Sequence, residues 1–177
     1  MTALGPEQGR IVVRTTREGV AAKVGHDLEI EFGSWSGELE LPDGDPGAAR
    51  VSARVQVNSL RVVSGVGGVA ALTDGDRQEI TRSALKVLDA DRHPNIEFRS
   101  EKVRSDGDGG ELTGALQIAG SSAPLILQVT ATGPQTWRAT GTIRQTSFGI
   151  KPYKAFLGAL RLSDQVGIEV DIRLSGA

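Results

Sequence analysis

Cysteine is absent from this 177-residue sequence, and histidine occurs only twice, as His26 and His93. Without cysteine the chain has no disulfide framework, no thiolate nucleophile and no cysteine ligand for zinc. A zinc site would need three or four ligands, and neither histidine stands in an H-x-E or H-E-x-x-H pattern. The sequence therefore predicts neither a metal site nor a cofactor.

The sequence also lacks a surplus of charge and a long apolar run. The formal net charge is −2, whereas nucleic-acid binding usually requires a basic face. No segment approaches the roughly 18 apolar residues of a membrane-spanning helix. Met1 to Arg10 has no basic region followed by an apolar stretch, as a secretory signal would. We therefore expect a cytoplasmic protein with no nucleic-acid partner and no integral membrane segment.

Short stretches of alternating apolar and polar residues dominate the chain, for example Leu28 to Phe32 and Ile168 to Leu174. This period of two places successive side chains on opposite faces of a strand. The predicted strands are Arg10–Thr15, Gly19–Val24, Leu28–Phe32, Trp35–Leu41, Val51–Asn58, Ile96–Val103, Glu111–Ile118, Leu125–Thr132, Trp137–Gln145 and Val166–Leu174. Since several can fuse across bends, we expect a mainly β fold of about eight strands, a sandwich or a closed barrel. A closed barrel of this size has room for one small ligand.

One segment in the middle of the chain, Asp76 to Leu88, follows a helical period instead. Its apolar residues share one face of a helix: Ile80, Ala84, Val87 and Leu88. Thr73 and Asp76 fit the pattern of an N-terminal cap, and Pro94 prevents the helix from continuing. We expect this helix to cover an open end or a flank of a barrel.

Three patterns resemble catalytic or cofactor motifs but lack the structural context of those motifs. Gly65 to Ala70 matches the dinucleotide pattern G-x-G-x-x-G/A, yet Thr73 to Gly75 interrupts the chain and no parallel strand follows. Gly33 to Gly37 (GSWSG) has serine at the wrong position for a hydrolase elbow, so a bend is favoured. His26 and Asp27 could act as a base and its orienter, which leaves open an enzyme acting on a lipid-like small molecule.

The segment Phe148 to Leu157 is unusual in composition, because it holds two of the four phenylalanines, the single tyrosine and two lysines. One interpretation is a loop that folds back on the core. The other is a portal, at which apolar rings meet the tail of a ligand and Lys151 or Lys154 meets an anionic head group.

Several separated segments together resemble the YceI-like family of polyisoprenoid-binding proteins over nearly the whole chain. These segments are Val24–His26, Trp35–Leu39, Leu85–Asp89, His93–Ser100, Leu112–Gly120 with Pro124 and Leu125, and Phe148–Ile150. The resemblance implies a lipocalin-like antiparallel β-barrel with one inserted α-helix and a long apolar interior. It also implies isoprenoid ligands, including polyprenyl phosphates and isoprenoid quinones. His26 matches a histidine that the family tends to place there.

The leading hypothesis is a non-enzymatic carrier, storage or sequestering protein for an isoprenoid lipid, formed by a single domain of residues 1–177. The residues expected to line the interior are Leu28, Ile30, Phe32, Phe98, Leu116, Ile118, Phe148, Ile150, Phe156 and Leu157. The head-group candidates are His26, Lys151 and Lys154. A structural barrel with a filled core is the remaining alternative, and edge strands near an open mouth make a homodimer plausible.

Overall fold

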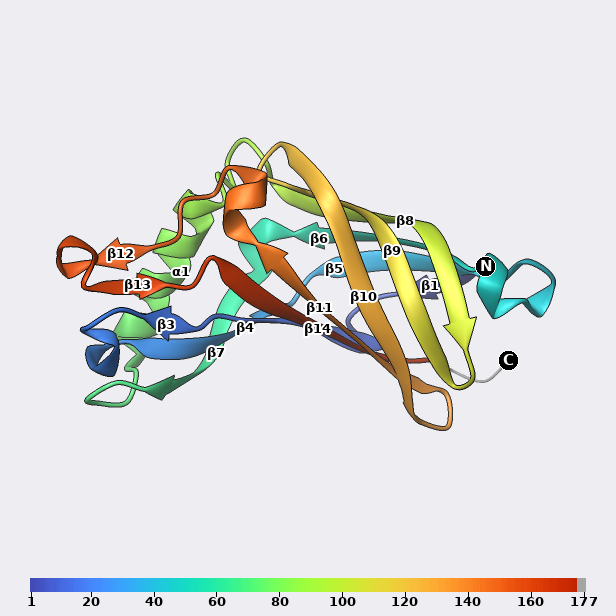
Figure 1. Ribbon diagram of the computed structural model, residues 1–177, viewed down its shortest axis with the longest axis horizontal. Coiled ribbons are helices and arrows are strands. Elements are labelled where there is room, and N and C mark those ends of the chain that lie inside the picture. The colour runs from blue at the N-terminus through green and yellow to red at the C-terminus, as the bar shows by residue number, and fades with distance from the viewer. Residues whose placement is uncertain (175–177) are drawn as a thin grey trace.

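The computed structural model describes residues 1–174, and most of them belong to one antiparallel sheet that curls round on itself (Figure 1). The order of its eleven strands is β1-β5-β6-β8-β9-β10-β11-β14-β2-β4-β7. The strands are β1 (Thr2–Leu4), β2 (Gly9–Arg14), β4 (His26–Phe32), β5 (Trp35–Glu40), β6 (Arg50–Gln56), β7 (Leu60–Gly67), β8 (Asn95–Asp106), β9 (Gly109–Ile118), β10 (Ser121–Gly133), β11 (Thr136–Arg144) and β14 (Gln165–Arg173). A small second sheet comprises β3 (Arg17–Glu18), β12 (Lys154–Ala155) and β13 (Leu160–Leu162).

A shared corner between two pairs of strands makes the sheet curl. The strands β4 and β5 form one bent run, which lies beside a second bent run made by β6 and β7. At the bend the Gly33 N–H donates to the Ser59 carbonyl (3.1 Å), and the Gln56 N–H donates to the Ser34 carbonyl (3.0 Å). Because the two runs stay hydrogen-bonded through the corner, the sheet continues from β2 through these runs to β8, as in a barrel.

The mainly β architecture predicted from the sequence is confirmed, although the main sheet has eleven strands instead of about eight. Much of the difference arises because the bend at the corner divides each run into two strands, and because the short edge strand β1 is counted. One predicted strand, Gly19–Val24, is wrong: these residues form a turn and a 3-10 helix, η1 (Ala22–Val24), after Gly19 adopts a φ of 101°. The strand β7 was not predicted, because its glycines at positions 65 and 67 weaken the strand pattern.

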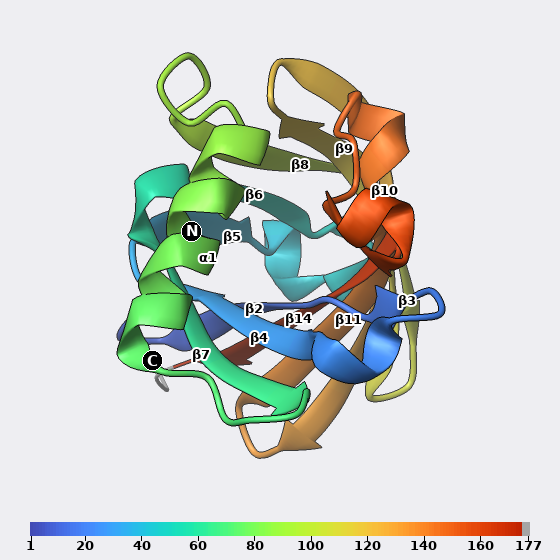
Figure 2. The ribbon, with the colours of Figure 1, turned by 90° about the vertical axis from the view of Figure 1, so that its left-hand side faces the viewer.

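The single α-helix among the described residues, α1 (Asp74–Val87), begins two residues before the predicted start and ends one before the predicted end. Its predicted cap is confirmed: the Asp76 N–H donates to Thr73 Oγ1 (3.1 Å), and the Thr73 N–H donates to an Asp76 carboxylate oxygen (2.8 Å). The bond from the Thr73 N–H, together with one from the Thr73 hydroxyl to the same carboxylate oxygen (2.7 Å), holds the pKa of Asp76 below its ordinary value. The helix lies across one end of the curled sheet (Figure 2), where Ile80, Ala84 and Leu85 pack against the core.

A network of ion pairs crosses the outer face of five neighbouring strands, β7, β4, β2, β14 and β11. Glu31 accepts hydrogen bonds from Arg10 (2.8 Å) and Arg61 (2.9 Å). Further pairs join Arg14 to Glu29 and Glu169, and Arg138 to Asp171. The network covers Val12, which points outward between Ile11 and Val13 and is only 2% exposed. The wall is therefore apolar on its inner face and held by charged side chains on its outer face.

None of the helices formed by residues 1–174 is both long enough and apolar enough to span a bilayer.

We expect Glu31→Gln to lower the free energy of unfolding at neutral pH by about 1 kcal/mol, since solvent screens both half-exposed arginine partners. The hydrogen bond from Arg10 holds the pKa of Glu31 below its ordinary value of 4.5. A depressed carboxylate pKa stabilises the folded state at neutral pH, and this contribution disappears as the pH falls through the depressed value. Urea unfolding at neutral and at acidic pH measures the difference.

The control is Glu97→Gln, which removes a more exposed carboxylate that contacts Arg54 on another part of the wall. We expect a smaller loss for this variant. An equal loss in both variants, or a loss for Glu31→Gln that persists in acid, would contradict the role given to Glu31.

Candidate ligand-binding cavity

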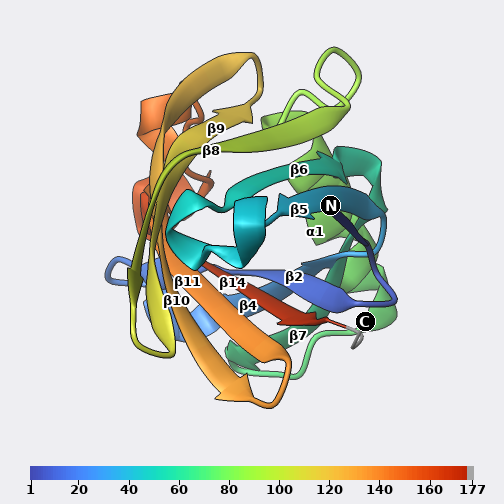
Figure 3. The same ribbon diagram turned by 90° about the vertical axis from the view of Figure 1, so that its right-hand side faces the viewer.

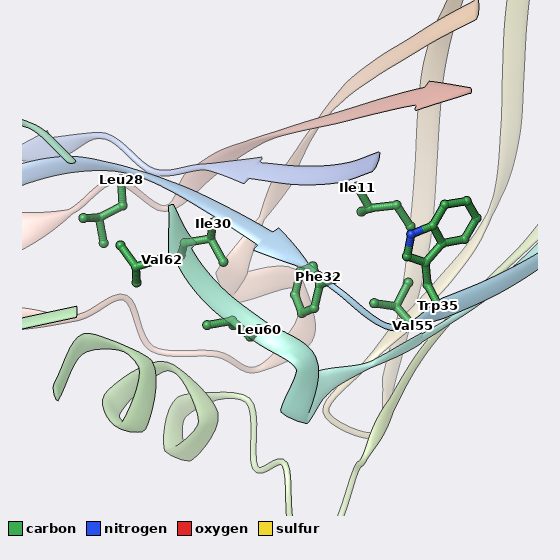
Figure 4. Close-up of a cluster of buried hydrophobic side chains, with 8 residues drawn as sticks. All are labelled: Ile11, Leu28, Ile30, Phe32, Trp35, Val55, Leu60 and Val62. Atoms are coloured by element: carbon green, nitrogen blue, oxygen red, sulfur yellow. The ribbon is translucent and has the colours of Figure 1, made fainter. Parts of the chain in front are cut away.

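The curled sheet encloses a cavity of about 1240 Å³. This volume exceeds the roughly 300–1,000 Å³ of sites for drug-sized molecules. Figure 4 shows one wall of the interior, along which buried side chains from β2, β4, β5, β6 and β7 are spread. Seen from the opposite end to α1, the strands wrap round this interior on all sides (Figure 3). The inside of the sheet is therefore hollow and does not form a filled core.

Strand alternation decides which residues reach the cavity. On β4, Leu28, Ile30 and Phe32 line it, while Glu29 and Glu31 face outward into the ion-pair network. On β9, Leu112, Leu116 and Ile118 line it, whereas Thr113, Ala115 and Gln117 face outward. The lining of β10 continues along most of the strand with Leu125, Leu127, Val129 and Ala131. The cavity is therefore elongated along the strands.

The helix α1 closes part of the cavity at the end where β3, β7 and β12 also finish (Figure 2). Its contribution to the lining is mostly apolar and comes from Ile80, Ala84, Val87 and Leu88, together with Leu72 before the helix. This confirms the expectation that the amphipathic helix covers an end or flank of the sheet.

The residues that the sequence nominated as ligand-binding fall into three groups. Seven line the cavity: Leu28, Ile30, Phe32, Phe98, Leu116, Ile118 and Ile150. Phe148 is 3% exposed and packs in the apolar cluster beside the cavity. Phe156 and Leu157 are exposed at the tip of the segment after β12 and do not line it.

Polar side chains gather where the cavity meets α1, and here His26 lies in the lining. Its Nε2 is 2.8 Å from the Ala70 carbonyl oxygen. Gly68 lies against the imidazole, since a Cβ on this glycine would fall 2.4 Å from the ring. The other two head-group candidates, Lys151 and Lys154, are exposed near this end but outside the lining.

His26 and Asp27 contact different partners in the structure. The Arg17 backbone N–H donates to Asp27 Oδ1 (2.8 Å), and the Arg17 guanidinium lies 3.8 Å from the same oxygen. The His26 ring instead contacts the Ala70 carbonyl. The base-and-orienter pair that would support an enzyme is thus not formed by these side chains. Within residues 1–174 there is also no group of three or more histidine, aspartate or glutamate side chains placed to hold a metal ion.

Sequence reasoning missed three polar residues of this mouth, Arg17, Tyr153 and Arg161, all of which line the cavity. Arg161 lies on β13 and pairs with Glu18 of β3 (3.3 Å), 143 residues earlier in the chain. No local pattern could have revealed that pair. Tyr153 did lie inside the segment singled out by its composition, which was a usable signal.

The curated relatives that match this chain are UPF0312 proteins. One from Pectobacterium atrosepticum is 27% identical over 128 residues, which are 67% of this chain and 61% of the relative. One from Pseudomonas aeruginosa is 22% identical over 129 residues, with a coverage of 68% and 62%. The chain thus spans about three fifths of the length of these relatives.

Two solved structures are similar in fold. The crystal structure of BcnA from Burkholderia cenocepacia has a TM-score of 0.69 at 16% identity, and the match covers 94% of this chain and 96% of that one. The YCEI protein of Campylobacter jejuni has a TM-score of 0.64 at 15% identity, with 84% of each chain covered. The YceI-like domain matches residues 7–174, nearly the whole chain, and the protein therefore belongs to the YceI-like family.

Proposed function

We propose that this protein binds an isoprenoid lipid inside the curled sheet and acts as a carrier, storage or sequestering protein. The observation that carries the proposal is the cavity of about 1240 Å³, whose walls are mostly aliphatic. Removing a long apolar tail from water is favourable by about 25 cal/mol for each Å² buried. A tail of this kind needs an apolar channel and no directional chemistry.

The shape of the cavity favours a chain over a compact ligand. The inward side chains of β10 line the cavity from Leu125 to Ala131. This stretch corresponds to about 20 Å at roughly 3.3 Å per residue. An extended prenyl tail matches a space that is elongated in this way.

The charges in the lining favour a lipid whose head group is neutral, as in an isoprenoid quinone, over a polyprenyl phosphate. All three arginines of the lining are already paired, Arg17 with Asp27, Arg104 with Glu111 and Arg161 with Glu18. The lining also holds Asp76, Glu79 and Asp108, which contact no cation within residues 1–174. A phosphate would meet a surplus of negative charge, whereas the Tyr153 hydroxyl in the lining can donate a hydrogen bond to a carbonyl.

We expect Ala139→Trp to abolish uptake of a prenyl lipid, because Ala139 lines the cavity from β11 and the larger ring would occupy the channel. Native mass spectrometry after incubation with lipid measures the bound fraction, and circular dichroism checks the fold. The matched control is Thr142→Trp, which places the same side chain on the opposite, exposed face of the same strand. Lipid uptake that is unchanged in Ala139→Trp would rule out this cavity as the binding site.

We expect an isoprenoid quinone to raise the melting temperature more than a polyprenyl phosphate with the same tail, since only a ligand that binds the folded state stabilises it. Glu79→Gln removes a negative charge from the lining and should strengthen phosphate binding by about two- to fivefold. Asp74→Asn is the control, because Asp74 lies on the same helix outside the lining. A larger shift with the phosphate in the unaltered protein would reverse the head-group assignment.

A further inference from the structure

Exposed apolar side chains concentrate at the end of the molecule where the cavity meets α1. Eleven large apolar residues among the described part of the chain are exposed. Three of them, Met1, Leu41 and Ile126, lie elsewhere, and Val87 lies on α1 itself. The other seven occupy the end of β7 and the segments next to β3, β7 and β12: Val20, Val24, Val66, Val69, Tyr153, Phe156 and Leu157. Figure 1 places the ends of these three strands together beside α1. A cluster of this kind marks an interaction surface, whereas scattered apolar residues do not.

The most prominent part of this cluster is the docking tip, which we define as Val20, Phe156 and Leu157. Val20 is 94% exposed, Phe156 is 67% exposed and Leu157 is fully exposed. The two loops that carry them are bonded together, since the Ala21 N–H donates to the Ala159 carbonyl (2.9 Å). The strand pairing of β3 with β13 fixes the same two segments. The tip is thus one surface built from residues far apart in the sequence.

The backbone of the tip is strained, although the side chains that it carries are exposed. Phe156, Leu157 and Gly158 have consecutive positive φ angles of 50°, 56° and 89°. Residues other than glycine adopt this left-handed region at an energetic cost, and such strain clusters at functional sites. Here the strained residues present a phenylalanine and a leucine to solvent, so the folded chain by itself gains no apolar burial from them.

The charge around the tip indicates its partner. Lys23, Lys151 and Lys154 are three of only five lysines in the chain, and all are exposed. None of the three forms an ion pair within residues 1–174, whereas the nearby Arg17 and Arg161 are paired with Asp27 and Glu18. The tip therefore carries local positive charge on a protein whose net charge is −2. Apolar side chains flanked by lysines match a bilayer surface containing anionic lipids.

We propose that the docking tip inserts into an anionic bilayer and brings the mouth of the cavity to the membrane surface. The tip adjoins that mouth, because Tyr153 of the same segment lines the cavity beside Arg161. Because α1 carries Asp74, Asp76 and Glu79 at this end, the proposed docking requires that the tip, and not the helix, contacts the anionic surface. The purpose of docking rests on the proposed function, since it gives a lipid a route between bilayer and cavity without crossing water.

Co-sedimentation with vesicles tests the proposal directly. We expect the protein to sediment with vesicles of phosphatidylcholine and phosphatidylglycerol and to bind vesicles of phosphatidylcholine alone much more weakly. The double variant Phe156→Asn with Leu157→Asn should weaken binding by about tenfold or more, because two apolar side chains no longer enter the bilayer. Asparagine tolerates positive φ, so the tip should keep its shape. Each of Lys151→Gln and Lys154→Gln should weaken binding by about fivefold.

Ile126→Asn is the matched control, because Ile126 is an exposed apolar residue on the wall of the sheet away from the tip. The proposal is overturned if the unaltered protein does not bind anionic vesicles, or if the double variant binds as well as the control. It is also overturned if analytical ultracentrifugation reveals a dimer that the double variant abolishes, since the tip would then bind a second copy of the chain.

A separate measurement on the unaltered protein keeps this test independent of the proposed function. A melting-temperature shift with a short, water-soluble prenyl ligand reports on the cavity without any membrane. Vesicle binding without that shift would support membrane docking by the tip and contradict lipid binding in the cavity. A shift without vesicle binding would do the opposite.

Discussion

The curled sheet has a concave apolar face, and the side chains on that face are too small to fill the space it encloses. Strand alternation supplies one inward residue in every two, and burying these residues drives the sheet to curl. The sequence has only seven aromatic residues in 177, so the inward positions are mostly aliphatic. Valine, leucine, isoleucine and alanine cover the wall while leaving about 1240 Å³ in the middle. The hollow interior, the covering helix and the polar mouth all depend on this mismatch between enclosed volume and side-chain volume.

The curled sheet surrounds a cavity and not a filled core, so it gains less stability from interior packing. Ion pairs on its outer face contribute part of the stability. The ion pairs of Arg10, Arg14 and Arg138 join neighbouring strands that belong to distant parts of the sequence. Individually such pairs contribute little, but a network across five strands also shields Val12 from water. The bonded corner at Gly33 and Ser34 keeps the curl continuous without requiring interior contacts. The interior can therefore remain apolar and hollow.

The end that carries α1 combines features that a closed core would not tolerate. The arginines that line the cavity here form ion pairs, as Arg161 does with Glu18. The charged groups without an ion pair within residues 1–174 include acidic residues in the lining and lysines outside the lining. The same end holds the strained residues Phe156 and Leu157. The neutral head group and the anionic surface that we propose as partners match this separation of charge.

The sequence by itself determined most of the strands and the helix cap of this protein, because both depend on residues close together in the chain. The alternation in residues 28–32 and 168–174 sets both the strands and their inward residues, because the period of two is a property of the backbone itself. The cap at Thr73 and Asp76 lies within one turn of helix, and it was therefore visible in the sequence. Tertiary structure alone decided whether the inward residues met in a filled core or around a cavity, because the enclosed volume depends on the curl of the whole sheet. It also decided that Asp27 engages Arg17 instead of His26. The exposure of Phe156 was decided there too, since its loop is bonded to one more than a hundred residues earlier in the chain.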